Sequence, residues 1–416
     1  MDGDVERDAI EGLNRSEAAL REYADEHGLV LTSESPWPGY VPAEEQRGAV
    51  RHAIWSLAGK LPGGAPGRLR HQAVYGKTFG MDVAMQHTIM VCRLPESVGY
   101  VPMLCCRPDE LGMGLYYWGG DQRPRETAKF ESAELDRRYV IDYAKGQDEN
   151  WLFQLCSPTF IDFLAHETPQ DFGFKLQSGV FTCETPQWRG QHAPDGEVSH
   201  ELLDLLANTG GTVAGRIRDE VLEEVAGSAA PDGPSAAAHA EWSTRPQHGR
   251  IVGLLMKLTG GEEDDGIATY AESRGLEVEP PAEFHTRYIT LPFPGVATGV
   301  ATGALPPGDR RGSLAWLEYS SEVDIQQEYV AAVSDYAQDL PTSWVDGDEI
   351  AVPGFGDEIP AGALAAAREA GFGISTAGRA ACVYERTGGT HTKEEIDAFA
   401  ARAVGVLDRL GPERPD

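Results

Sequence analysis

Long apolar runs are missing from this chain of 416 residues. The strongest one, IVGLLM at residues 251–256, stops at Lys257 and is far shorter than the roughly 20 residues that cross a bilayer. The opening residues, MDGDVERDAI, are acidic and lack the basic flank and apolar stretch of a secretion signal. These absences predict a cytoplasmic protein that does not insert into membranes.

Positive charge is also scarce. Lys and Arg number 35 against 66 Asp and Glu, which gives a formal net charge of −31. The carboxylates are spread along the chain, and such a surface repels phosphate backbones and anionic lipids. We therefore expect no nucleic-acid partner, and a protein partner is favoured.

Cysteines with the spacing of a metal or redox site are missing as well. None of the six forms a Cys-x-x-Cys pair, and a long chain without an export signal usually keeps its thiols reduced and buried. Cys105 and Cys106 are neighbours in an expected strand, so they point to opposite faces and cannot readily share one ion. We expect no metal and no cofactor. The six are Cys92, Cys105, Cys106, Cys156, Cys183 and Cys382.

The length predicts two domains, and a hydrophobic content of 41% is enough to build packed cores. Residues 226–249 lose all apolar periodicity and are rich in Ala, Ser, Pro and Gly, so they are expected to form a linker. The linker separates a larger N-terminal α+β domain, residues 1–225, from a smaller second domain, residues 250–416.

Similar fragments occur in both halves in the same order. YADEHGLVL at 23–31 is similar to YAESRGLEV at 270–278, and FGFKLQSGVFTC at 172–183 is similar to FGISTAGRAAC at 372–382. The pattern predicts an internal duplication whose second copy is shortened and diverged. Each copy is expected to be an antiparallel sheet covered on one face by helices.

The repeated unit is expected to be a hairpin followed by a long amphipathic helix. The hairpins should span 171–184 and 371–385, and the helices should begin near Ser199 and Thr392, which can cap them. The shared cysteines, Cys183 and Cys382, should pack beneath the helix.

Other elements follow from periodicity and from turn residues. Ser157-Pro158 predicts a helix start, with Phe160 on its buried face. The remaining expectations are a helix over 8–27 closed by Gly28, a helix around 43–58, strands within 68–106, a kink or break at Gly210-Gly211, and a flexible surface loop over 295–308.

Residues 130–184 carry a pattern made of FESAELDRRYVIDY, WLFQLCSPTFIDFL and FGFKLQSGVFTC. It resembles an uncharacterised bacterial, actinobacterial-type domain family of unknown function. That family has a Phe-Glu-Ser entry, a basic-aromatic strand, a helix opening with Ser/Thr-Pro-x-Phe, and a short hairpin. The resemblance implies the fold of this segment, and it brings no catalytic residues with it.

Four side chains could form a catalytic or metal site in the first domain: His71, His87, Cys156 and Cys183. A Cys and a His could act as nucleophile and base, but no metal-type or catalytic spacing supports this, and buried filler residues are the simpler interpretation. The acidic stretch 345–359 could bind calcium, but Ala351 stands where the ligand loop needs Gly.

No assembled catalytic motif is present, so the sequence favours a non-catalytic binding or protein-interaction protein of unknown ligand. Two alternatives stay open. One is an enzyme with a Cys/His-containing pocket in the N-terminal domain. The other is a scaffold subunit of a larger complex.

Overall fold

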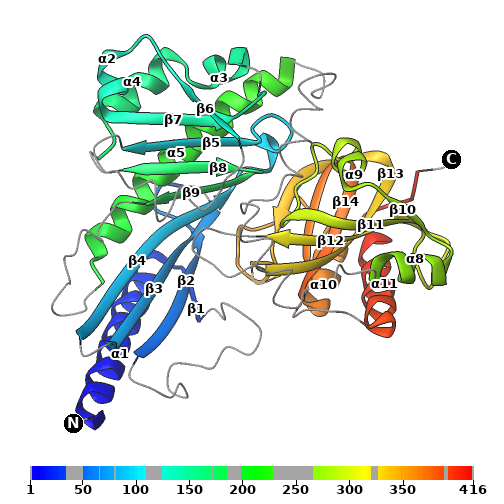
Figure 1. Cartoon of the computed structure of the whole chain (residues 1–416), viewed down its shortest axis with the longest axis horizontal. Coiled ribbons are helices and arrows are strands. Elements are labelled where there is room, and N and C mark those ends of the chain that lie inside the picture. Colours follow the sequence, from blue (N-terminus) through cyan, green and yellow to red (C-terminus); the bar gives the residue numbers. More distant parts are fainter. Residues whose placement is uncertain are drawn as a thin grey trace.

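The chain folds into two α+β units, each built on an antiparallel sheet, as Figure 1 shows. The α+β expectation is therefore confirmed. The expected linker lies outside the described residues, except for its first two residues at the end of a helix. The computed structural model describes residues 2–33, 50–64, 66–78, 81–108, 124–147, 149–169, 172–184, 198–227, 266–319, 327–347, 349–387 and 392–414.

The first unit holds a nine-stranded sheet in the order β1-β2-β3-β4-β9-β8-β5-β7-β6. One row of paired residues crosses all nine strands and is apolar throughout, which is the period-two pattern of a half-buried sheet. The row is Leu31, Leu57, Leu69, Met90, Cys183, Phe174, Cys106, Ile141 and Ala128. The strands are β1 (Val30–Ser33), β2 (Val50–Lys60), β3 (Pro66–Thr78), β4 (Met81–Arg93), β5 (Met103–Pro108), β6 (Arg125–Ala128), β7 (Tyr139–Ala144), β8 (Gly173–Gln177) and β9 (Val180–Glu184).

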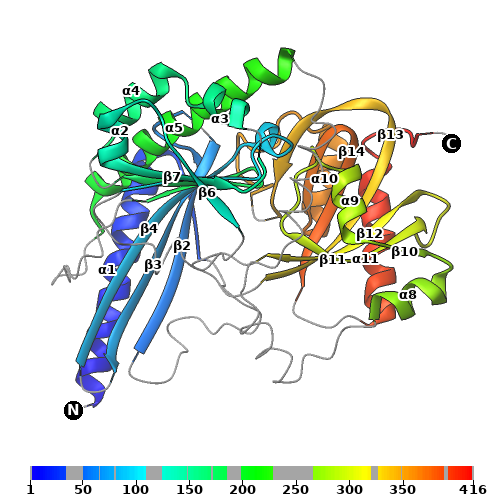
Figure 2. The same cartoon turned by 45° about the horizontal axis from the view of Figure 1, so that its top comes forward.

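Two long helices, α1 (Asp2–His27) and α5 (His200–Gly227), cover the apolar face of this sheet, as Figure 2 shows from a second angle. Gly28 closes α1 with φ 66°, as expected. No helix within the described ranges is long and apolar enough to cross a membrane. The short helices of this unit are α2 (Ala133–Arg138), α3 (Glu149–Leu155), α4 (Pro158–His166) and the 3₁₀ turn η1 (Pro95–Ser97).

The helix α5 is continuous, so the expected kink or break at Gly210-Gly211 is wrong. A Cβ on Gly210 would lie 2.3 Å from Met90 Sδ and 2.4 Å from Cys183 Sγ. The glycine therefore lets the helix approach the sheet closely.

The second unit holds a five-stranded sheet in the order β10-β11-β12-β13-β14. Helices α8, α10 and α11 pack on one face, and the short helix α9 packs on the other, so this sheet is covered on both faces rather than one. Thr392 caps α11 in a capping box with Glu395. The elements are α8 (Gly266–Arg274), β10 (Glu277–Glu279), α9 (Pro281–Arg287), β11 (Val296–Ala304), β12 (Arg311–Tyr319), β13 (Gln327–Val345), α10 (Ala361–Ala370), β14 (Gly373–Thr387) and α11 (Lys393–Leu407).

The two expected hairpins differ. Strands β8 and β9 form a hairpin because Ser178 (φ 49°) and Gly179 (φ 79°) both adopt the left-handed backbone of a two-residue turn. The matching hairpin over 371–385 is wrong, because β14 is one strand that pairs with β13 on both sides of Gly378. The pairing of β13 with β14 shifts register on both sides of Leu340, where β13 carries extra residues.

This difference changes where the two cysteines point. Cys183 faces α5, but Cys382 lies on the opposite face of its sheet, in the cluster that contains Phe284 of α9. Phe172 and Cys183 are eleven residues apart, whereas Phe372 and Cys382 are ten, and a shift of one residue moves a side chain to the other face. The expectation that both cysteines pack beneath the helix is therefore right for Cys183 and wrong for Cys382.

One segment that was expected to be a helix and one that was expected to be a loop are strands in the structure. Residues 43–58 were expected to be helical, but from Val50 onward they form β2; residues 34–49 lie outside the described ranges. The expected loop over 295–308 is mostly β11, whose Gly299 and Gly303 admit the side chains of Ile267 and Leu276 at close range.

A hydrogen bond joins the first helix to the last helix in each unit. Tyr23 Oη donates to Asp204 Oδ1 at 2.8 Å in the first, and Tyr270 Oη donates to Asp397 Oδ1 at 2.9 Å in the second. The tyrosine and aspartate of each pair lie more than a hundred residues apart, so the contact ties the two ends of each unit together.

Candidate binding face of the nine-stranded sheet

The four residues expected to carry chemistry do not meet in one site. His71 is on the helix-covered face of β3, with its Nδ1 2.8 Å from Thr88 Oγ1. Burial, with a smaller contribution from His87, lowers the pKa of His71 to about 3, so it is neutral at physiological pH. His87 lies on the opposite face of the sheet, where its Nε2 is 2.8 Å from Glu184 Oε2. Cys183 contacts Met90 in the core, with 3.7 Å between the sulfur atoms.

Five of the six thiols are unsuited to nucleophilic chemistry. All six cysteines are free and buried, as the sequence predicts. Cys156 packs in the core where α3 meets α4. Burial raises the pKa of Cys92 and of Cys156 to about 12. Burial also raises the pKa values of Cys106, Cys183 and Cys382. A thiol with a raised pKa stays protonated at neutral pH and is a poor nucleophile.

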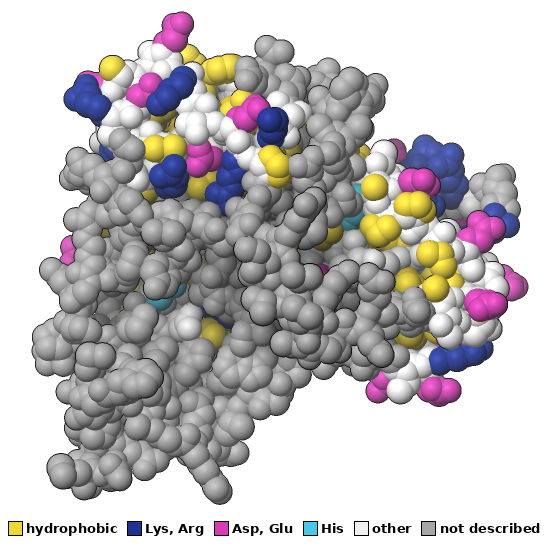
Figure 3. Space-filling view, viewed as in Figure 1, with side chains coloured by type: hydrophobic (Ala, Val, Ile, Leu, Met, Phe, Trp, Pro, Cys, Tyr) yellow, Lys and Arg dark blue, Asp and Glu magenta, His cyan; other side chains and the backbone are white. Residues whose placement is uncertain are grey.

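The face of the nine-stranded sheet that points away from α1 and α5 is basic. It is turned toward the viewer in Figure 1, and Figure 3 shows Lys and Arg side chains over the region of β5 to β8. Its acidic residues among the described strand positions are Asp142 and Glu184. Its basic residues are Lys60, Arg68, Arg70, Arg93, Arg107, Arg125 and Lys175. We call this surface the basic face.

The register explains why these residues share one side. One row of paired residues on this side crosses the sheet from β3 to β6. The row is Arg68, Val91, Thr182, Lys175, Cys105, Asp142 and Thr127. Each of these residues is the chain neighbour of a residue in the apolar row, so each points the other way.

The two carboxylates of the basic face are each held by a neighbour. Asp142 accepts a hydrogen bond from Thr127 Oγ1 at 2.7 Å and from Arg107 Nε at 3.3 Å. Glu184 contacts His87 through one oxygen, and its other oxygen, Oε1, is buried without a hydrogen-bond donor among the described residues. Only 9% of the Glu184 side chain is exposed, so this acceptor is costly to leave unfilled.

The second unit places two carboxylates on one end of the basic face. Glu349 lies between two guanidinium groups, with Arg68 Nη2 2.7 Å from its Oε1 and Arg93 bonded to both of its oxygens. Arg93 also pairs with Asp346. Burial lowers the pKa of Arg93, but Asp346 and Glu349 more than offset this and raise it overall. We call these four residues the inter-unit ion cluster.

Aromatic side chains of the second unit support the inter-unit ion cluster. The Arg93 guanidinium lies over the Trp344 ring, 4.9 Å from its centroid. Trp344 Nε1 donates to Tyr384 Oη at 2.7 Å, and Tyr384 Oη donates to Asp346 Oδ1. Trp344 and Tyr384 belong to the apolar cluster of the second unit that contains Phe284, and Val180 at the start of β9 packs against this cluster. Charge and packing therefore act together at this contact.

The α9-side face of the second sheet has a different composition. It is lined by apolar and aromatic side chains that pack against the α9 helix and the segment after it. Its buried members include Ala315, Leu317, Ala331, Val333, Ala377 and Tyr384. The basic face of the first sheet instead has Arg, Lys, His and Glu around a small buried apolar cluster of Met103, Cys105 and Ala144.

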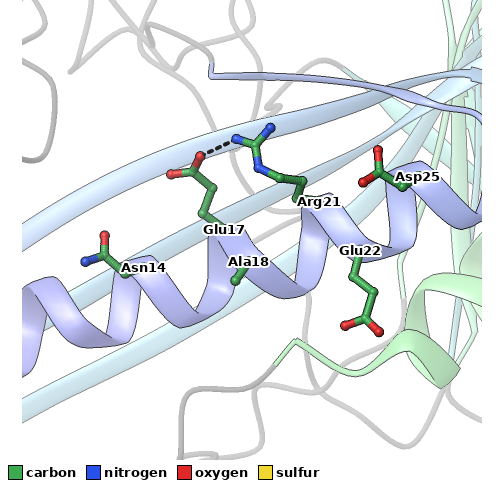
Figure 4. Close-up of a pocket in the computed structure, with 6 residues that line it drawn as sticks. All are labelled: Asn14, Glu17, Ala18, Arg21, Glu22 and Asp25. Atoms are coloured by element: carbon green, nitrogen blue, oxygen red, sulfur yellow. Dashed lines mark hydrogen bonds and ion pairs between the residues drawn. The ribbon is translucent and has the colours of Figure 1, made fainter.

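A hollow of about 500 Å³ lies along the outer side of α1, as Figure 4 shows. Its described lining comes from one helix, and Arg21 pairs with Glu17 across 2.7 Å. A surface of this kind lacks converging groups from different elements, so we assign it no role. Among the described residues, no group of three or more His, Cys, Asp or Glu side chains is placed to hold a metal ion.

Sequence reasoning missed the residues of the basic face. The alternation of Arg68, Leu69 and Arg70 in β3 is a detectable signal, because it puts both arginines on one side of a strand. The pairing of Arg93 with Asp346 joins residues 253 apart in the chain, so no local pattern reveals it.

Comparison of the chain with models of protein families, with curated protein sequences and with solved structures finds no match.

Proposed function

We propose that this chain is a non-catalytic protein-interaction protein that receives its partner on the basic face. The observation that carries the proposal is the gathering of Arg and Lys on one sheet face in a chain with a net charge of −31. The main apolar core of this unit lies on the opposite side of the sheet. The basic residues are therefore not needed to form that core, and opposite-sign patches of this kind favour encounter with a charged partner.

The proposed location is the cytoplasm. Six free, buried cysteines support it, because reduced thiols are usual in that compartment. The raised pKa values of five of these thiols support a non-catalytic role in the same way.

The two units are proposed to be copies of one ancestral unit, the second shortened. The Tyr23–Asp204 and Tyr270–Asp397 hydrogen bonds support this. The two tyrosines begin the similar fragments YADEHGLVL and YAESRGLEV, and each aspartate lies five residues after the expected helix caps Ser199 and Thr392. In each unit five neighbouring strands come after the first helix and before the last helix in the chain, in the orders β1-β2-β3-β4-β9 and β10-β11-β12-β13-β14. Further strands and helices are inserted between β4 and β9, and α9 and α10 are inserted in the second unit. Membership of residues 130–184 in the bacterial family that they resemble is part of the same proposal; these residues form α2, β7, α3, α4 and the β8–β9 hairpin.

Capture of partners from cells that make the protein tests the proposed function. The bait is the full chain, compared with an Arg70→Glu/Arg107→Glu variant of the basic face. The control is an Arg21→Glu/Arg379→Glu variant, which changes the same amount of charge at exposed positions elsewhere. We expect a specific partner that the control retains and the face variant loses. A partner retained equally by both variants would place the interface elsewhere and refute the proposal.

A further inference from the structure

Arg93 in the inter-unit ion cluster is held in the way that a protein holds a ligand, and this observation is independent of the partner proposed for the basic face. Arg93 belongs to β4 of the first unit. Its guanidinium is bonded to Asp346 and Glu349 and lies over the ring of Trp344, all of the second unit. Only 13% of the Arg93 side chain is exposed. One unit therefore binds a single side chain of the other.

The two carboxylates are positioned by bonds that do not involve Arg93. Asp346 and Glu349 share one turn directly after β13, in which Glu349 N donates to Asp346 O at 3.0 Å and Asp346 N donates to Glu349 Oε2 at 3.1 Å. Gly347 lies between them, and a Cβ there would be 2.8 Å from Gly371 O. The close approach holds the turn against the backbone, so the second unit fixes both carboxylates itself.

The aromatic side chains orient the rest of the site. Trp344 Nε1 donates to Tyr384 Oη at 2.7 Å, and Tyr384 Oη donates to Asp346 Oδ1. Burial, with a further contribution from Asp346, raises the pKa of Tyr384, so its hydroxyl keeps the proton that it donates. The other oxygen, Asp346 Oδ2, is left to pair with Arg93.

The geometry fits a guanidinium group better than an ammonium group. Arg93 Nη1 bonds to both oxygens of Glu349, Nη2 bonds to Asp346, and the plane of the group lies over Trp344. An ammonium group has one nitrogen and no flat face, so it cannot make all of these contacts at once. Arg68 and Arg93 together balance the two carboxylates, and loss of Arg93 leaves one negative charge of the cluster unbalanced.

We propose that the second unit carries a binding site for a guanidinium group, formed by Trp344, Asp346, Glu349 and Tyr384. Arg93 is the tethered ligand of this site, and its recognition joins the two units. A free alkylguanidinium ion occupies the site when residue 93 no longer supplies the group.

Rescue of the full-length Arg93→Ala variant by methylguanidinium tests this inference. Urea denaturation followed by circular dichroism measures the ratio of folded to unfolded protein in methylguanidinium chloride or methylammonium chloride, at equal ionic strength. We expect a saturable rise with methylguanidinium, about tenfold at a concentration about ten times its dissociation constant. Methylammonium should give no saturable rise, because it lacks the second terminal nitrogen and the flat face.

Three further proteins serve as controls. The wild type should not respond, because Arg93 fills its site. Arg379→Ala should not respond either, because it removes an arginine whose pair with Asp339 is exposed. The Arg93→Ala/Glu349→Gln variant should bind methylguanidinium about tenfold more weakly than Arg93→Ala, because a charged acceptor has been lost.

The titration also covers a variant that does not fold by itself. If Arg93→Ala is unfolded in buffer, methylguanidinium should restore its native circular dichroism and methylammonium should not. An equal response to the two ions, no response to either, or a rescue that Glu349→Gln leaves unchanged would overturn the inference.

Discussion

Glu349→Gln should weaken the contact between the two units by a large and measurable amount. Only 2% of the Glu349 side chain is exposed, and it is bonded to Arg68 and Arg93, whose side chains are 11% and 13% exposed. The substitution keeps the volume but removes the charge, so two largely buried guanidinium groups lose their shared counter-ion. Removing one partner of a buried ion pair costs about 3–5 kcal/mol.

Asp346 remains beside Arg93 in the variant, so we expect a loss near the lower limit, about 3 kcal/mol in the free energy of unfolding. Urea denaturation at pH 7, followed by circular dichroism, measures it for the wild type, Glu349→Gln, Arg93→Met and the double variant. The double variant should lose less than the sum of the single losses, with a coupling of about 0.5–3 kcal/mol.

The exposed Glu17–Arg21 pair gives a matched control, and Glu17→Gln should change the free energy of unfolding by less than about 0.5 kcal/mol. A loss below about 1 kcal/mol for Glu349→Gln, or strict additivity in the double variant, would show that the inter-unit ion cluster does not hold the units together.

Three further outcomes check other parts of the structure. Phe160→Ala should reduce the free energy of unfolding by about 3–5 kcal/mol, because Phe160 is fully buried in the first core; a loss below about 1 kcal/mol in urea denaturation would contradict this. His71 has a folded-state pKa of about 3 and an ordinary value of 6.5, so the unfolded chain binds more protons between these pH values. Stability should therefore fall by about 1.4 kcal/mol per pH unit as the pH drops through this range, a slope that His71→Gln removes in denaturation curves and exposed His166→Gln does not. A thiol reagent without reductant should label all six cysteines in denaturant and almost none in the native protein; rapid native labelling would show that a thiol is accessible.

Local signals made several elements predictable from the sequence. Ser157 accepts a hydrogen bond from the backbone N–H of Phe160, as a Ser-Pro helix start requires. Gly28 and Thr392 likewise mark a helix end and a helix start through backbone and capping chemistry that acts within four residues. Such features depend on neighbours in the chain, so they can be read from it.

The elements that were predicted wrongly depend on the rest of the fold. Strand β2 has buried apolar residues on both faces, Ile54 on one and Leu57 on the other, so it lacks the alternation of a half-buried strand. Glycines 299 and 303 are typical of loops, but here they admit side chains from α8 and from Leu276. The basic face was missed because seven residues on six strands become one surface only after the sheet has formed.

The strand β14 has a consequence for the protein in concentrated solution. It ends the five-stranded sheet and spans 15 residues, and within the described part of the chain it pairs only with β13. By contrast, the edge strands β1, β6 and β10 have only four, four and three residues. A long edge can template the addition of strands from other molecules, and charged side chains along it discourage this. Arg379 and Arg386 are exposed on β14. Their charges disfavour the pairing of a strand from another molecule with β14, which is the edge where self-association of the folded protein would begin.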